Sequence, residues 1–152
     1  MPFSTEEYLA LPRGETWLIK NIIPFGGTVV CHAKSKSGKS WAALGICLAV
    51  SQPTCDDWLG HKVYHHGKVL YMQMDAPRNM WITDYLLPLL RIGMDLSEFC
   101  WTDRASAPAA FNILDTAHRD WLAAEGASVR PQLVVFDTIR ETHMADENDS
   151  GP

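Results

Sequence analysis

Two hydrophobic patterns alternate along the chain, and together they predict an α/β fold. The first pattern is a short apolar run, rich in β-branched residues and bounded by Gly, Pro or Asp, which is typical of a buried strand. We expect such strands at Thr28–His32, Lys68–Met74, Phe99–Trp101 and Leu133–Phe136.

The second pattern is an apolar stripe at helical spacing, and it occupies the intervening stretches. It predicts helices over Gly38–Val50, Arg78–Ile92 and Leu114–Glu125, with a kink or interruption of the second one at Pro88. Because strands and helices alternate, we expect a mostly parallel sheet with helices packed on it in three layers.

Composition narrows the class of protein. The chain has 152 residues, of which 47% are hydrophobic and 20% charged, which suits one globular domain with a core. With 13 Lys and Arg against 18 Asp and Glu, the net charge of -5 argues against coating nucleic acid by bulk charge. The longest apolar run, Trp41–Val50, is too short to cross a bilayer, and no signal peptide is visible. We therefore expect a cytoplasmic protein with no membrane partner.

Cysteine and histidine offer little evidence of a metal or disulfide site. The four cysteines lack the short spacings of a zinc knuckle or a redox pair, so we expect them to be reduced. His65 and His66 are adjacent in an expected turn, and we interpret them as solvated loop residues.

The strongest chemical signal is a phosphate-loop pattern between the first expected strand and the first expected helix. Its residues are Ala33, Lys34, Ser35, Lys36, Ser37, Gly38, Lys39 and Ser40, with Ala where Gly is commoner at the first position. A chain that leaves a strand and enters a helix directs its N–H groups at one point, where the helix dipole adds positive potential. We expect Gly38 to allow close approach of a phosphate, Lys39 to bridge the β- and γ-phosphates, and Ser40 to coordinate Mg²⁺.

Two carboxylates follow expected strands and are candidates for the chemistry of hydrolysis. Asp137 comes directly after Leu133–Phe136, at the strand end where ligands bind in open α/β sheets, and we predict that it holds Mg²⁺. Asp75 ends Lys68–Met74 in the same way and could polarise an attacking water. The segment Asp75–Pro77 is also a good helix N-cap sequence, so this role has a structural alternative.

An ordered set of segments resembles the RecA-like AAA ATPases of the RepA type, which are plasmid and phage replication ATPases related to hexameric helicases. The resemblance runs from about Trp17 to Pro152. It rests on Trp17–Lys20, Gly26–Gly27, the loop Ala33–Ser40 with Trp41, Trp58–Gly60, Gly67–Tyr71, Asp137–Arg140 and Asp146–Ser150.

This resemblance implies a RecA-like P-loop core that takes ATP and Mg²⁺, often in a ring with ATP between subunits. Lys39 and Ser40 match the Walker A lysine and hydroxyl, and Asp137 matches the Walker B acid. Asp75 stands where the family usually has a catalytic Glu, which puts hydrolytic competence in doubt. Arg140 and Asp146–Ser150 match a motif on the γ-phosphate side, with a solvated acidic loop as the alternative for the latter. Trp41 follows the loop and is a natural fluorescence reporter of nucleotide.

The resemblance also predicts that the sheet is incomplete on its C-terminal side. In the RecA-like arrangement, a strand that follows the Walker B segment in sequence lies between it and the phosphate-loop strand. We therefore expect residues 1–152 to be one partial ATPase domain with an N-terminal extension over 1–16. DNA contacts would come from parts outside this chain, and the complete protein would be a homo-oligomeric ring.

Three functions compete at this point. The leading one is an ATPase of DNA replication or recombination, of helicase or helicase-loader type. A non-hydrolysing nucleotide switch or assembly module is favoured by Asp75 in place of Glu. A small-molecule kinase is the third, although no cluster of arginines stands between Asp75 and Asp137 to form a lid.

Overall fold

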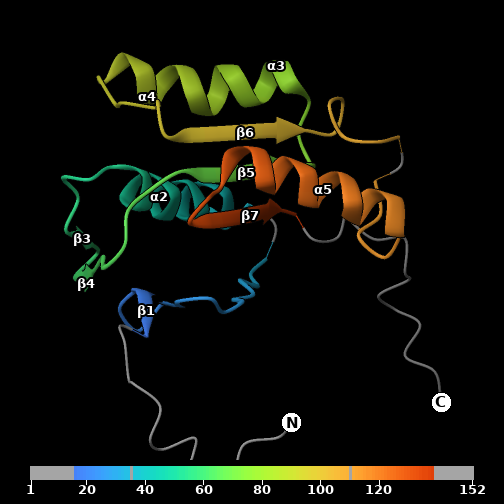
Figure 1. Ribbon diagram of the computed structural model, residues 1–152. Helices are drawn as coiled ribbons and strands as arrows, with labels where there is room; N and C mark the ends of the chain where they lie inside the picture. The colour runs from blue at the N-terminus through green and yellow to red at the C-terminus, as the bar shows by residue number, and fades with distance from the viewer. Residues whose placement is uncertain (1–15, 35, 110, 139–152) are drawn as a thin grey trace, which may run out of the picture.

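A three-stranded parallel sheet forms the centre of the computed structural model, which describes residues 16–34, 36–109 and 111–138. Its strands are β5 (Val69–Gln73), β6 (Phe99–Asp103) and β7 (Leu133–Asp137), in the order β6-β5-β7. The register aligns Gln73 with Asp103 on one side and with Asp137 on the other. The carboxyl ends of all three strands therefore meet at one edge (Figure 1).

Helices cover both faces of this sheet, which confirms the predicted α/β layering (Figure 1). Alternate residues of β5 divide between two cores, as the period of a strand requires. Val69 and Tyr71 join a core that contains residues of α2 (Lys39–Ser51) and α3 (Arg78–Trp81). Leu70 and Met72 face the other way, against α5 (Thr116–Val129).

The second predicted helix is interrupted, although the interruption lies before Pro88 rather than at it. The segment consists of α3, a π-helical turn η1 (Ile82–Leu86) and α4 (Leu87–Arg91). Proline lacks an N–H and its ring clashes with the carbonyl four residues earlier, here that of Asp84. The wider π turn spans that carbonyl, and the α-helix resumes with Pro88 in its first turn.

The predicted strand over Thr28–His32 is wrong, because that segment is not in a sheet in the structure. Val29 is 50% and Val30 70% exposed, although both are strong strand formers. A strand needs a neighbour to satisfy its N–H and C=O groups, and no strand of the described residues pairs with this segment. The chain instead reaches α2 through a solvent-exposed stretch without regular secondary structure, followed by a turn over residues 36–38.

Two short antiparallel pairs lie outside the central sheet. They are β1 (Trp17–Ile19) with β2 (Ile23–Pro24), and β3 (Asp57–Trp58) with β4 (His61–Lys62). The expectation of solvated loop histidines after them is correct only in part, because His65 and His66 lie in a loop but are half-buried. His65 Nε2 and His66 Nδ1 are buried without a hydrogen-bond partner among the described residues, and the His65 ring packs against Phe25, 4.4 Å between centroids. None of the helices described has the length and apolar character needed to cross a membrane.

Candidate active site

The phosphate-loop segment closes around the ammonium group of its own lysine. Lys39 Nζ donates hydrogen bonds to the carbonyl oxygens of Ala33 and Lys34, both at 3.0 Å. The Ser37 N–H donates to the Lys34 carbonyl at 3.3 Å, which tightens the turn. The positively charged Lys39 ammonium group therefore lies beside the backbone of the loop.

The amino terminus of α2 is open to an anion. Gly38 precedes the helix with φ 87° and ψ 16°, and no side chain caps the free N–H groups of the first turn. The first turn contains no acidic residue, so its partial positive charge is not neutralised from within. A Cβ on Gly38 would meet no atom within 4 Å, so glycine is needed there for its left-handed backbone rather than for space.

Trp41 lies one helical position beyond Ser40 and is 49% exposed. Its ring packs against Tyr85 of η1, with 4.9 Å between centroids. One side of the indole is therefore supported by protein while about half of its surface faces solvent. Both properties suit the predicted role as a fluorescence reporter beside the loop.

Asp137 ends β7, and its carboxylate is held by a residue that the sequence did not single out. The Tyr71 hydroxyl donates to Asp137 Oδ2 at 2.6 Å. The Met74 N–H donates to the Asp137 backbone oxygen at 2.8 Å, so the ends of β5 and β7 are also joined through their main chains. Asp137 is half-buried at the sheet edge, with Oδ2 engaged by the phenol.

Burial and the Asp137 carboxylate together raise the pKa values of two neighbouring groups. Burial raises the pKa of the Tyr71 phenol far above its usual value, and its hydrogen bond to Asp137 raises that pKa further. Burial likewise raises the pKa of the Cys47 thiol of α2, with the negative charge of Asp137 as a second cause. Both groups therefore stay protonated at neutral pH.

Asp75 lies at the same sheet edge as Asp137, two residues beyond the end of β5. It is exposed and lines a hollow of about 360 Å³ together with Arg78 and Asp103. Among the described residues, no hydrogen bond or ion pair joins Asp75 to Lys39 or Asp137. The structure thus brings Asp75 to the predicted edge without fixing its carboxylate there.

An ion pair between a buried carboxylate and a half-exposed arginine lines the same hollow and was not foreseen from the sequence. Asp103 is 2% exposed and accepts hydrogen bonds from Arg78 Nε and, at 2.8 Å, from Arg78 Nη2. The Arg78 guanidinium, together with the Ser106 hydroxyl and N–H, lowers the pKa of Asp103 to about 2. The signal was available, because Asp103 follows an apolar run just as Asp75 and Asp137 do. It was missed because the strand was expected to end at Trp101.

Gln73 occupies the centre of this edge, between Asp103 and Asp137 in the strand register. The side chain is 2% exposed, and its Oε1 has no hydrogen-bond partner among the described residues. A buried oxygen in that state normally has a water or ligand as its partner. No feature of the sequence distinguished Gln73 from the apolar residues around it.

Comparison with known protein families shows the family to which the chain belongs. The family model described as AAA domain matches residues 1–151. This chain belongs to the AAA domain family. No curated protein matches it. AAA domains are P-loop ATPases as a class, which bind nucleotide with Mg²⁺.

The residues of this AAA domain fit a nucleotide with Mg²⁺ on the chemistry of their donors. An uncapped helix terminus, the Lys39 ammonium and the open space at Gly38 suit phosphate oxygens. No group of three or more His, Cys, Asp or Glu in the described ranges could hold a metal ion by itself. Mg²⁺ usually takes one or two protein oxygens and completes its shell with water and substrate phosphates, which matches Ser40 and Asp137.

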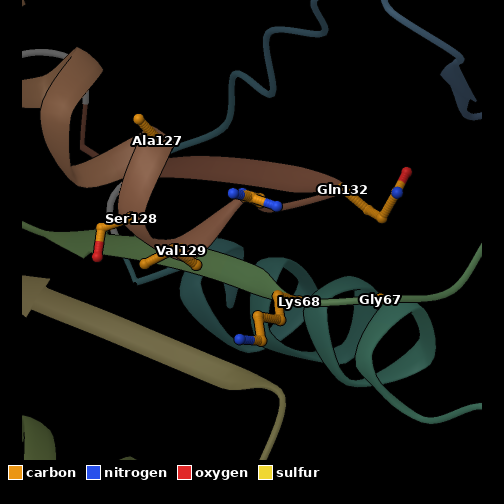
Figure 2. Close-up of a pocket in the computed structure, with 7 residues that line it drawn as sticks. Gly67, Lys68, Ala127, Ser128, Val129 and Gln132 are labelled. Carbon is orange, nitrogen blue, oxygen red and sulfur yellow. The ribbon is translucent and has the colours of Figure 1, made fainter.

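A larger hollow, of about 620 Å³, lies at the opposite edge of the sheet (Figure 2). Lys68, Ser128, Arg130 and Gln132 supply its polar groups. In Figure 2 the Lys68 and Gln132 side chains extend in different directions, so they do not converge on one ligand atom. The carboxyl end of α5 also adds partial negative charge here, which opposes an anion. This edge therefore suits an anionic ligand less well than the edge that carries Asp75 and Asp137.

Several predicted site residues lie outside the described part of the chain. These are Ser35 of the loop, Arg140 and the stretch Asp146–Ser150. The expected N-terminal extension over 1–16 also falls almost entirely there.

Proposed function

We propose that this chain binds ATP with Mg²⁺ at the loop 33–40 and hydrolyses it. One observation supports this most strongly: the Lys39 ammonium lies against the loop carbonyls at the entrance to an uncapped helix terminus. A phosphate chain placed there meets N–H donors, a helix dipole and a mobile cation together. Ala33, Lys34, Ser35, Lys36, Ser37 and Gly38 would line it, with Trp41 and Arg140 beside it.

Each residue then has a defined task. Lys39 exchanges its carbonyl contacts for the β- and γ-phosphate oxygens, while Ser40 and Asp137 hold the metal ion. Bound Mg²⁺ neutralises charge that develops on the phosphates. Asp75 accepts a proton from the attacking water as the water oxygen bonds to the γ-phosphorus. The bond to the β–γ bridging oxygen breaks, and ADP and phosphate are released.

We further propose that the activity serves DNA replication or recombination, in a RecA-like enzyme of the RepA helicase or helicase-loader type. The ordered motifs from Trp17 to Asp146–Ser150 support this placement. On this reading the working form is a cytoplasmic homo-oligomeric ring, and DNA is contacted by parts outside these residues.

A second candidate, a nucleotide switch that binds without turnover, is favoured by Asp75. A general base works best when neighbouring groups fix its position. Asp75 is exposed, and within the described ranges no ion pair or side-chain hydrogen bond anchors it. Aspartate is also one methylene shorter than glutamate, so its reach toward a water differs by more than about 1 Å.

Steady-state ATP hydrolysis with and without single-stranded DNA separates these functions. We expect Mg²⁺-dependent phosphate release that Lys39→Ala and Asp75→Asn abolish. Stimulation by DNA is expected only of a longer protein that includes the parts that contact DNA. Lys68→Ala, at the opposite edge, is the matched control and should leave the rate unchanged. Binding of ATP without release of phosphate would favour the switch. Transfer of phosphate to an added alcohol acceptor would instead indicate a kinase.

A further inference from the structure

The hydroxyl group of Tyr71 contacts the carboxylate of Asp137. Tyr71 lies in the middle of β5, is fully buried, and pairs in register with Val135 of β7. Asp137 is two residues further along β7, and therefore on the same face as Val135. The tyrosine side chain spans this diagonal, so that its hydroxyl reaches Asp137 Oδ2 at 2.6 Å.

The ring that presents this hydroxyl is itself fixed by aromatic neighbours. It stacks on Trp81 of α3, with 4.8 Å between centroids and 24° between planes, and packs against Phe99 of β6 at 5.9 Å. Trp81 is 1% exposed, so this support belongs to the core rather than to the surface. The phenol oxygen therefore has little freedom to leave the carboxylate.

The donor and acceptor roles of this pair follow from their chemistry. A carboxylate only accepts hydrogen bonds, so the phenol must donate its proton to Oδ2. One oxygen of Asp137 is then committed to the protein, and Oδ1 remains for a metal ion or a water bound to it. Partners that hold a ligating carboxylate in this way commonly change metal affinity or activity about 10- to 100-fold when removed.

We propose that Tyr71 is a positioning residue for the metal site, which fixes the Asp137 carboxylate so that Oδ1 is presented to Mg²⁺. This inference rests on the proposed function, because it assumes that Asp137 serves a nucleotide-bound metal ion. Tyr71 does not touch the metal or the nucleotide; it acts through Asp137. The buried hydroxyl is thus a functional group in a position where phenylalanine would pack equally well.

Tyr71→Phe tests this, because it removes the hydroxyl and keeps the ring. The experiment uses the full chain and a fluorescent N-methylanthraniloyl-ADP, first in EDTA and then in a titration with Mg²⁺. We expect affinity in EDTA to stay within twofold of wild type. We expect the Mg²⁺ concentration for half-maximal enhancement to rise about 10- to 100-fold. Tyr64→Phe, at a half-buried tyrosine outside the site, is the control and should change neither value.

The results of this experiment distinguish a failure of the Tyr71 proposal from a failure of the proposed nucleotide site. If Asp137→Asn loses the Mg²⁺ response but Tyr71→Phe keeps it within twofold, the positioning role is overturned and the proposed site stands. If wild type shows no nucleotide binding in Mg²⁺, both fail. A lower melting temperature with an unchanged Mg²⁺ response would assign Tyr71 to the core alone.

A second experiment keeps Tyr71 in place, and it tests the proposal even if the Tyr71→Phe variant does not fold. With 3-fluorotyrosine incorporated, the ¹⁹F resonance of Tyr71 can be assigned by replacing the other three tyrosines. We expect it to shift when Mg²⁺ is added to the ADP complex, and to stay in place when Asp137→Asn is present. A Tyr71 resonance that does not respond to Mg²⁺ in otherwise wild-type protein overturns the proposal.

Discussion

Asp103 offers a sharp test of how the edge beside Asp75 is held together. Its carboxylate is 2% exposed and paired with Arg78 and Ser106, so Asp103→Asn removes the charge while keeping the shape. The pairing lowers the pKa of Asp103 from 3.8 to about 2. That difference corresponds to at most about 2.4 kcal/mol at 1.36 kcal/mol for each pKa unit. Because Arg78 is half exposed and partly screened by solvent, we expect about 1–2 kcal/mol.

The dependence on pH follows from the direction of this shift. Since the folded-state pKa lies below the unfolded value, the contribution is complete above about pH 5 and is lost as the pH falls through 2. Urea unfolding followed by tryptophan fluorescence measures it. We expect Asp103→Asn to lower the free energy of unfolding by about 1–2 kcal/mol at pH 7 and by about half as much at pH 3.

A matched substitution on the surface of α5 controls for the loss of one negative charge. Asp120 is exposed, and Asp120→Asn should change stability by less than about 0.5 kcal/mol at either pH. The reasoning fails if Asp103→Asn matches this control at pH 7. It also fails if the effect of Asp103→Asn is as large at pH 3 as at pH 7.

Three further predictions concern the core and the edge. Trp81→Ala should cost about 3–5 kcal/mol in urea unfolding because the indole is 1% exposed and stacked on Tyr71. Val30→Ala should cost less than about 0.5 kcal/mol, since Val30 is 70% exposed; a cost above about 1.5 kcal/mol would place Val30 in a core after all. Gln73→Met should leave the nucleotide-free protein as stable or more stable, because it removes a buried oxygen without a partner. Calorimetric unfolding of the two proteins measures this difference. If Gln73→Met lowers the free energy of unfolding by more than about 1 kcal/mol, the Gln73 oxygen already has a partner.

Local sequence patterns predicted most elements of the fold. Strand β7 and helix α2 lie within one residue of their expected bounds, because an apolar run and an Ala- and Leu-rich helix are determined by neighbouring residues. The prediction of a strand over Thr28–His32 was wrong for the opposite reason. Its β-branched residues favour an extended chain, but a strand forms only where a distant segment pairs with it, and no local pattern records that partner.

The same limit applies to the candidate site. The loop 33–40 and the carboxylates Asp75 and Asp137 were visible because each stands at the junction of a predicted strand with the next segment. The hydrogen bond from Tyr71 to Asp137 forms because β5 and β7 are neighbours in the sheet. The local sequence of either strand does not predict this strand order. Arg78 and Asp103 meet for a similar reason, across the ends of two neighbouring elements.

Nucleotide binding by wild type and Lys39→Met is the most direct test of the central claim. Lys39→Met removes the ammonium that lies at the loop carbonyls, and Lys68→Met removes an exposed lysine at the opposite edge. The readout is the fluorescence of N-methylanthraniloyl-ATP in Mg²⁺, with excess unlabelled ATP as competitor. We predict saturable binding in wild type and Lys68→Met, and a loss of at least tenfold in affinity in Lys39→Met. Equal binding by all three proteins, or no competable binding in wild type, would contradict a nucleotide site at this loop.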